Sequence, residues 1–194
     1  MRSEVLKIYK MKIRGITTLV WNRDKLEIRD LVKGLNKDEL EEHEKKNWLM
    51  KAETNNGNAL LPPEWIIGCL VSSAKETRIV PWYATSKNQT YTKYISNIKV
   101  SPGKEIVICK TKELKRKDAL LPARGKAGGG KVLRCHPIIE KWEAEFEIID
   151  TVGFMKKDEL NRLLTYGGRA VGIGDQRLTN FGRFELISLK EVKQ

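Results

Sequence analysis

Apolar and polar side chains alternate along two long stretches of the chain, which is the pattern of a half-buried β-strand. Residues 4–21 alternate apolar side chains with basic or polar ones and predict one long strand, bulged near Gly15. Residues 141–149 place apolar side chains between glutamates and predict another half-buried strand. Two shorter apolar runs, residues 105–109 and 181–189, predict a buried strand and the final strand of the chain.

Apolar residues recur at helical spacing in three other segments. Residues 35–51 predict a charged helix that begins at Asn36 and has a narrow apolar stripe. Residues 64–76 follow two prolines and carry a broad apolar face, so they predict a helix that packs on a core. Residues 156–166 predict a third helix, which the two glycines at 167–168 are expected to end.

Without the intervening segments, these elements follow the order β-α-β-β-α-β, which is that of ferredoxin-like domains. The predicted fold class is α+β, with a ferredoxin-like (RRM-like) βαββαβ core and long insertions. We expect a single domain over residues 1–194, with insertions at about residues 22–62, 78–103 and 110–134. This fold supports many functions, and one face of its sheet is available to nucleic acid.

Positive charge is concentrated in one of these insertions. The chain of 194 residues has a formal net charge of +12, and between Lys110 and Arg134 basic residues outnumber acidic ones by nine to two. A proline and a run of glycines in the same segment predict a long hairpin or flexible loop that projects from the core. This density of charge indicates a partner rich in phosphate, whereas a solvated lysine-rich loop is the alternative.

A glycine- and arginine-rich segment follows the third predicted helix. Residues 166–185 contain five glycines and three arginines. Glycine lets the backbone approach a ligand closely or adopt a positive φ, and arginine offers a planar set of donors for phosphate. The segment therefore indicates either a backbone cradle for a polyanion or a tight turn.

Several other chemistries lack a residue that they require. Residues 125–131 match the glycines and lysine of a phosphate-binding P-loop, but Val132 stands where serine or threonine would hold Mg²⁺. Residues 172–177 lack the third glycine of a dinucleotide-binding loop. The three cysteines are widely spaced and indicate neither disulfides nor a zinc site. We expect a cytoplasmic protein with no cofactor, no metal and no membrane span.

Two segments of the chain resemble a known family. Residues 166–185, Tyr-Gly-Gly-Arg-Ala-Val-Gly-Ile-Gly-Asp-Gln-Arg-Leu-Thr-Asn-Phe-Gly-Arg-Phe-Glu, resemble the C-terminal glycine-rich loop of the RAMP superfamily, more narrowly of Cas7-like proteins of CRISPR systems and phages. Residues 61–70, which begin Leu-Pro-Pro-Glu-Trp, resemble the start of the first helix of these proteins. The resemblance implies a ferredoxin-like core, a protruding hairpin at residues 110–134, and single-stranded nucleic acid held along a basic groove by several subunits in a row.

Candidate catalytic residues are few. The aspartate that cleaves RNA in some members of the family has no recognisable counterpart, although Asp24 and Asp30 lie in the corresponding region. His136 is a candidate general base for an endoribonuclease of the related Cas6 type, but the interpretation that it ends a hairpin strand is favoured. His43 lies among glutamates on what we expect to be a solvated helix face. We therefore predict a protein that is not an enzyme.

The sequence thus predicts a non-catalytic protein that binds single-stranded RNA or DNA and forms a homo-oligomer or filament along the strand. The alternatives are a Cas6-like metal-independent endoribonuclease and a viral interaction module that mimics a CRISPR subunit. Tyr9 is expected to stack a base on the exposed face of the first strand, and Tyr83, Tyr91 and Tyr94 are weighed for the same role. The predicted nucleic-acid-binding residues are Lys7, Tyr9, Lys10, Lys12, Lys112, Lys115, Arg116, Lys117, Arg124, Lys126, Lys131, Arg134, Gly168, Arg169, Gly172, Gly174, Arg177 and Arg183.

Overall fold

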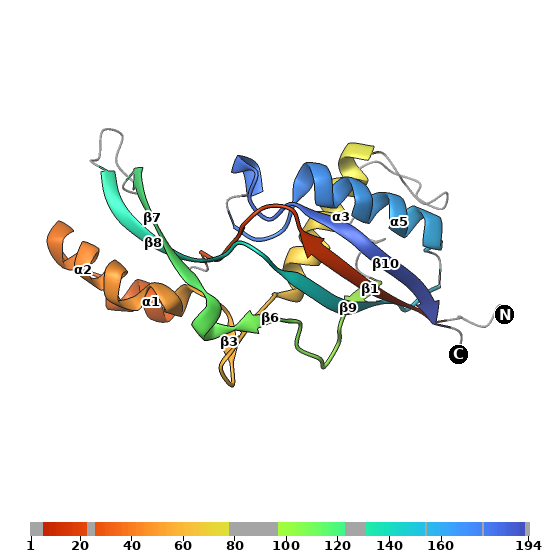
Figure 1. Ribbon diagram of the computed structural model, residues 1–194, viewed down its shortest axis with the longest axis horizontal. Coiled ribbons are helices and arrows are strands. Elements are labelled where there is room, and N and C mark those ends of the chain that lie inside the picture. Colours follow the sequence, from red (N-terminus) through yellow and green to blue (C-terminus); the bar gives the residue numbers. More distant parts are fainter. Residues whose placement is uncertain are drawn as a thin grey trace.

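A four-stranded antiparallel sheet forms one end of an elongated molecule, shown in Figure 1. The computed structural model describes residues 6–22, 26–77, 97–122, 131–153, 155–175 and 177–192. The strands lie in the order β10-β1-β9-β5. Their bounds are Lys7–Gly15 for β1, Ile98–Val100 for β5, Glu143–Asp150 for β9 and Phe184–Val192 for β10.

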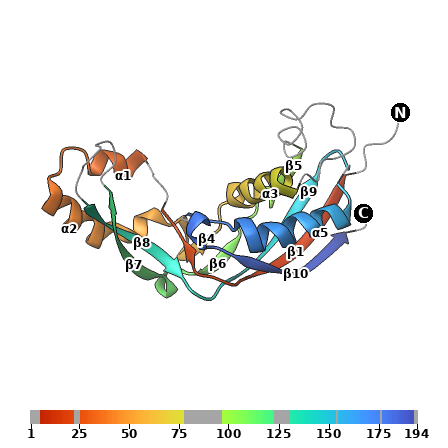
Figure 2. The same cartoon turned by 90° about the horizontal axis from the view of Figure 1, so that it is seen from above.

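Two neighbouring helices, α3 (Pro63–Thr77) and α5 (Lys157–Tyr166), pack on this sheet (Figure 2). Successive side chains of a strand point to opposite faces, so Tyr9, Met11 and Ile13 of β1 are buried in the core. The leucines of α5 and the apolar face of α3 complete the same core cluster. Helices that cover one face of an antiparallel sheet confirm the predicted α+β class.

A β-hairpin and further helices form the other end of the molecule, at the left of Figure 1. The pairing of β7 with β8 over the length of β7 confirms the expected hairpin. β2 pairs with β8 near the base of the hairpin, and α2 and the 3-10 helix η1 pack against β8. The bounds are Leu19–Val20 for β2, Leu26–Leu31 for α1, Lys37–Asn47 for α2, Trp48–Lys51 for η1, Lys115–Pro122 for β7 and Lys131–Ile139 for β8.

A small third sheet lies between the two ends, in the order β3-β4-β6. Its strands are Thr54–Asn55 for β3, Asn58–Leu60 for β4 and Val107–Lys110 for β6, and the 3-10 helix η2 (Thr111–Glu113) follows. Asn56 (φ 47°) and Gly57 (φ 73°) form the turn between β3 and β4, and both have the positive φ of a type I′ hairpin turn. This hairpin was not predicted, although its Asn-Gly pair is a hairpin signal.

The first predicted strand is two strands in two different sheets. β1 ends at Gly15, where the indole of Trp142 occupies the space that a Cβ would need. The Trp142 indole N–H donates to the Thr17 carbonyl at 2.9 Å, and Ile16 N–H donates to the Arg183 carbonyl at 2.7 Å. These contacts turn the chain out of the four-stranded sheet, so the prediction of one long strand was wrong.

The strand that comes second in chain order in the four-stranded sheet was assigned to the wrong segment. Residues 105–109 were predicted to form it, but β6, which covers most of this segment, pairs with β4 in the third sheet. The place is taken by β5, which pairs Ile98 with Asp150 and Val100 with Ile148. Three residues with two apolar side chains carry little periodicity, and only the pairing with β9 makes them a strand.

The helix predicted over residues 35–51 begins where expected and ends early. Asn36 accepts from Glu39 N–H at 3.0 Å and Glu39 accepts from Asn36 N–H at 2.9 Å, which is a capping box. α2 ends at Asn47, and the last turn is the 3-10 helix η1.

Among the described residues, no helix is long and apolar enough to cross a membrane.

Candidate nucleic-acid interface

The open face of the four-stranded sheet carries paired charges of both signs. The register places Lys10 opposite Glu147 and Lys12 opposite Glu145. Lys10 Nζ lies 3.6 Å from a Glu147 carboxylate oxygen, and Lys12 Nζ lies 2.7 Å from one of Glu143 and 3.3 Å from one of Glu145. Hydrogen bonds from Lys12 and then Arg14 lower the pKa of Glu143. Because carboxylates neutralise these cations, the face does not form the basic surface expected of it.

The residues of β1 that were expected to bind nucleic acid lie on two different faces of the sheet. Lys10 and Lys12 are on the open face, whereas Lys7 and Tyr9 are on the face that covers the core. Tyr9 is fully buried, its hydroxyl donates to the Met155 carbonyl at 2.7 Å, and burial raises its pKa. Lys7 Nζ donates to the same carbonyl at 3.2 Å. The prediction that Tyr9 is exposed for stacking was wrong, because position 9 shares the core-facing side of the strand with Met11 and Ile13. Tyr83, Tyr91 and Tyr94 lie outside the described residues.

Two glycines at the end of α5 allow close packing and do not end the helix. The chain continues through a π-helical turn, η3 (Gly167–Val171), and stops at Gly172, which has a φ of 76°. A Cβ on Gly167 would lie 2.6 Å from Ser73 Oγ of α3. A Cβ on Gly168 would lie 2.2 Å from the Phe184 carbonyl oxygen of β10. The absence of side chains at these positions lets α5 approach both α3 and β10.

The backbone of the glycine-rich loop bonds to the protein itself. The N–H of Gly172 donates to the Gly167 carbonyl at 2.7 Å, and the N–H of Ile173 to the Gly182 carbonyl at 2.9 Å. Gly182 N–H donates to the Thr18 carbonyl at 2.8 Å. The N–H of Gly172 is used within the fold and Gly168 is buried against Phe184, so the expectation that these two glycines line a backbone cradle is not supported.

Gly174 also serves the packing of the loop. It has a φ of 83°, and a Cβ there would lie 2.8 Å from Leu19 Cδ1 and 3.1 Å from the Val20 carbonyl oxygen. The loop therefore closes tightly onto β2. It can offer side chains to a ligand, and its arginines are the residues to consider.

The arginines of the loop occupy different environments. Arg183 is half-buried, and its Nη2 donates to the Arg177 carbonyl at 3.3 Å and to Asn180 Oδ1 at 3.4 Å. Its Nη1 is buried and has no hydrogen-bond partner among the described residues. A Cβ on Gly68 would lie 3.5 Å from Arg177 Nη1, which places this half-buried guanidinium over α3. Arg169 is exposed on η3.

Most described cations of the hairpin are held by the protein. Lys115 pairs with Glu140 at 2.6 Å and lowers its pKa. Arg116 pairs with Asp118 at 2.9 Å and donates to the Lys45 carbonyl of α2 at 3.3 Å. The predicted contacts that remain exposed without an ion pair to a described residue are Lys112 and Lys131, whereas Arg124 and Lys126 lie outside the described residues.

Arg134 belongs to a buried cluster that fixes the hairpin to α2. Glu44 of α2 is 2% exposed and accepts from Arg134 Nη1 at 2.8 Å, from Cys135 N–H at 2.9 Å, and from Lys51 Nζ. Lys51 also donates to the Cys135 carbonyl at 2.8 Å. Burial raises the pKa of Glu44, but the hydrogen bonds from these donors outweigh burial and lower it. Glu44 belongs to the helix face that was expected to be solvated, so that expectation was wrong here.

His136, the candidate general base, is fully buried in β8. Burial, and next the charge of Lys51, lowers its pKa to about 4. A general base must reach the proton that it removes. The imidazole of His136 is closed off from solvent, so a substrate cannot reach it in this conformation.

Of the aspartates considered for catalysis, Asp24 lies outside the described residues and Asp30 is exposed on α1.

Burial of neutral His136 should make stability depend on pH. Its pKa is lower in the folded protein than in the unfolded chain, so the unfolded state binds more protons between pH 6.5 and pH 4. We therefore expect the free energy of unfolding to fall by up to about 3 kcal/mol as the pH is lowered from 6.5 to 4. Urea denaturation at several pH values measures the slope. The variant His136→Leu should show a smaller slope, and an unchanged slope would contradict the assignment.

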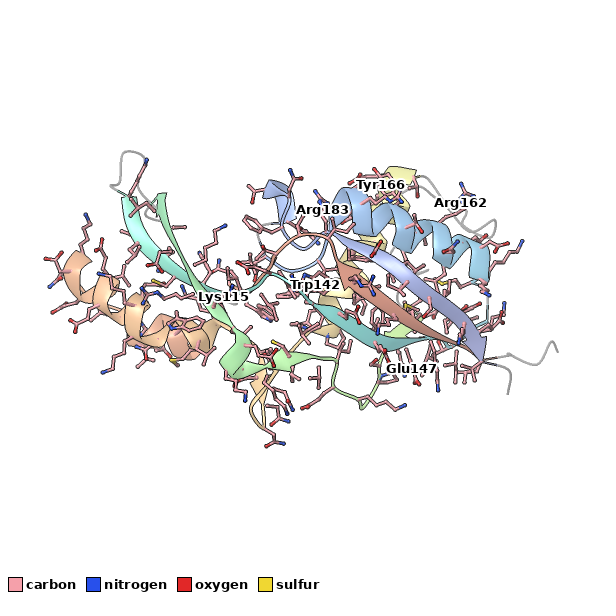
Figure 3. The ribbon with its side chains drawn as sticks, in the orientation of Figure 1. Lys115, Trp142, Glu147, Arg162, Tyr166 and Arg183 are labelled. Atoms are coloured by element: carbon pink, nitrogen blue, oxygen red, sulfur yellow. The ribbon has the colours of Figure 1, made fainter. Side chains whose placement is uncertain are left out.

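The structure brings the hairpin and the glycine-rich loop together. Lys117 of β7 places its Nζ 3.7 Å from the ring centroid of Phe181, which belongs to the loop. Ile16 is 56% exposed beside this loop and bonds to the Arg183 carbonyl. In Figure 3, Lys115 lies at the base of the hairpin, and Arg183 lies at the end of the four-stranded sheet that is closer to the hairpin. We call the junction surface the set Ile16, Lys117, Arg177, Phe181 and Arg183.

Phe181 and Ile16 were not predicted as site residues. The alternation around Ile16 was assigned to a continuous strand, and Phe181 was assigned to the final strand. β10 begins only at Phe184. The sequence signal that could have identified Phe181 is an aromatic residue between asparagine and glycine, two residue types that tolerate a positive φ. In the structure, Asn180 and Gly182 both have a positive φ.

The comparisons with known proteins find similarity at the level of structure. No protein-family model matches the sequence, and no curated protein matches it. The chain is similar to a chain in the cryo-EM structure of the type III-B Cmr-beta bound to cognate target RNA, with a TM-score of 0.56 and 16% sequence identity. The match covers 97% of this chain and 61% of the other, so this protein spans about three fifths of that chain's length. The protein therefore has a fold similar to that of a chain of the type III-B Cmr-beta.

Proposed function

We propose that this protein binds single-stranded nucleic acid at the junction surface. The contact between Lys117 and Phe181 carries the proposal, because it joins the basic hairpin to the glycine- and arginine-rich loop. These segments lie far apart in the sequence, and a phosphate-rich partner was one of the two interpretations of each. Their contact makes one continuous surface on which a polyanion can meet cations from both.

The charges of the junction surface suit a phosphate backbone. Lys117, Arg177 and Arg183 have no carboxylate partner among the described residues, in contrast to the cations of the sheet face. Arginine presents a planar set of donors to phosphate, and the loop already fixes the position of Arg183. Arg169 on η3 is exposed as well, whereas the register turns exposed Lys131 to the face of the hairpin opposite to Lys117.

We assign the four-stranded sheet to a ferredoxin-like core and the protein to the Cas7-like group. The order β10-β1-β9-β5 together with the connectivity β1-α3-β5-β9-α5-β10 supports the ferredoxin-like core. The glycine-rich loop and the protruding hairpin support the Cas7-like assignment.

The structural similarity to a chain of an RNA-bound assembly favours RNA over DNA and is consistent with several copies along one strand. The buried position of His136 favours a binding role without catalysis.

Binding should be strong at low salt and fall steeply with added salt. We expect fluorescence anisotropy with labelled single-stranded RNA to give a logarithm of affinity that falls by about 0.7 per contacted phosphate for each unit of log salt. The double variant Arg177→Ala/Arg183→Ala should reduce both the affinity and this slope. Single-stranded DNA and duplex DNA measured in the same way identify the preferred polymer.

The sheet face provides the matched control. Lys10→Ala and Lys12→Ala also remove cations, but those cations already pair with glutamates, so both variants should bind nearly as tightly as the wild type. Equal losses at the two surfaces would place the nucleic acid elsewhere. Absence of binding to any of the polymers at low salt would overturn the proposal.

A further inference from the structure

We infer that Phe181 is a stacking platform for one unpaired base, and that Lys117 covers its ring in the free protein and moves to the adjacent phosphate when nucleic acid binds. This inference rests on the proposed function and names a base-stacking site within it. It assigns a role to a residue that the charge pattern alone does not indicate.

Phe181 is a half-buried aromatic residue outside the hydrophobic core. The core cluster includes Phe146 and Phe184, and Phe181 belongs neither to it nor to the partly buried residues packed against it. Its ring contacts the ammonium of Lys117. The lysine covers a flat apolar face of this ring, and such a face can stack on the face of a nucleobase once the ammonium moves away.

The backbone around Phe181 is held rigidly. Gly182 has a φ of 68° and donates its N–H to the Thr18 carbonyl at 2.8 Å. On the other side, Thr17 Oγ1 donates to the Asn180 carbonyl at 2.8 Å. A ring fixed in this way can stack a base without first being ordered, which lowers the entropic cost of binding.

The contact with Lys117 is suited to exchange. A lysine has a flexible stem and a single point charge, so its ammonium can leave the ring for a phosphate oxygen without any backbone movement. The ring face that it leaves is then open to a base, and the cation stays close enough to contact the phosphate of the same strand. Arg183, two residues from Phe181, can hold the next phosphate. The site therefore takes a base and its neighbouring phosphates together, a set that only an unpaired strand presents.

Single-stranded RNA that contains 2-aminopurine tests the stacking directly, because stacking on an aromatic ring quenches the fluorescence of this base. We expect quenching on binding to wild-type protein, its loss in Phe181→Leu and its retention in Phe181→Tyr. Phe181→Leu should also weaken binding by about tenfold, as expected for one lost stacked base. Circular dichroism and urea denaturation check that the variants are folded.

The variant Lys117→Gln separates the two parts of the inference. It should keep the quenching, because the ring remains, and reduce the salt slope by about 0.7, because one phosphate contact is lost. Ile187→Ala on β10 removes an exposed apolar side chain outside the junction surface, so it is the control and should change neither quantity. Tight, salt-dependent binding without quenching, and unchanged in Phe181→Leu, would overturn the inference and leave the proposed function standing. Absence of binding by the wild type would overturn both.

Discussion

Glu44→Ala should lower the free energy of unfolding by about 3–5 kcal/mol, because it leaves buried positive charge without its counter-charge. Glu44 is 2% exposed and Lys51 is 6% exposed. Arg134 and the N–H of Cys135 would lose their acceptor in the same substitution. Chemical denaturation by urea, followed by circular dichroism, measures the change.

Glu42 of the same helix is the matched control. It is exposed, so Glu42→Ala should change stability by no more than about 0.5 kcal/mol. A similar loss in both variants would mean that the helix tolerates neither substitution and that the buried cluster has no special role. Glu44→Gln keeps the shape of the side chain and removes its charge, so it reports the contribution of the charge itself.

The contribution of Glu44 should also depend on pH. Its pKa is lower in the folded protein than in the unfolded chain, so the unfolded state takes up the proton first as the pH falls. The stabilisation is therefore present at neutral pH and is lost as the pH falls below about 4.5 through the folded-state pKa. This range lies below most of the range in which His136 titrates, so the two contributions separate in a pH series.

Gly182→Ala should lower the free energy of unfolding by about 3 kcal/mol or more, and it is the second large effect that we expect. Gly182 has a φ of 68°, and a Cβ there would lie 1.7 Å from the carbonyl oxygen of Ile173. That atom belongs to the backbone of the neighbouring segment, so it cannot move aside as the end of a flexible side chain can. Thermal and urea denaturation of the variant measure the loss.

Gly57→Ala separates the steric contact from the cost of a positive φ. Gly57 has a φ of 73°, but a Cβ there would meet nothing within 4 Å. Its replacement should therefore cost only about 1–2 kcal/mol. Equal losses at the two positions would mean that the loop can relax around a methyl group. A larger loss at Gly182 would confirm that the glycine-rich loop is packed tightly for structural reasons.

The tight packing of the loop changes how its glycines contribute to function. The N–H of Gly172 donates to the Gly167 carbonyl, and the N–H of Gly182 donates to the Thr18 carbonyl in the segment after β1. The proposed nucleic-acid contacts therefore come from side chains that this backbone holds in place, namely Phe181, Arg177 and Arg183. Destabilising the loop should weaken binding indirectly, so binding assays of glycine variants need a parallel measurement of stability.

Local patterns were sufficient for several elements of the fold. The helices at residues 64–76 and 156–166, the start of a helix at Asn36 and the hairpin within residues 110–134 were all predicted within a few residues of their bounds. Each depends on residues that are close in sequence, such as a cap or a repeating apolar face. The error at Tyr9 was avoidable by the same reasoning, because the alternation already placed it with Met11 and Ile13.

The elements that were missed or misplaced depend on long-range pairing. β5 is a strand because it pairs with β9, and β2 is separate from β1 because Trp142 and Arg183 turn the chain. Neither β9 nor Arg183 is close to these segments in sequence. A short segment carries too little periodicity to show which partner it will find, so no local pattern could have settled these assignments.

The strongly basic character, the concentration of charge near one hairpin and the glycines and arginines of one loop are all visible in the amino-acid sequence. Which of the cations can meet a ligand depends on the three-dimensional packing. Glutamates on a neighbouring strand neutralise Lys10 and Lys12, and a buried carboxylate from α2 binds Arg134. Lys117 instead reaches Phe181. The physical reason is that charge and side-chain alternation are properties of adjacent residues, whereas the partner of a charge is set by which strands and helices pack together.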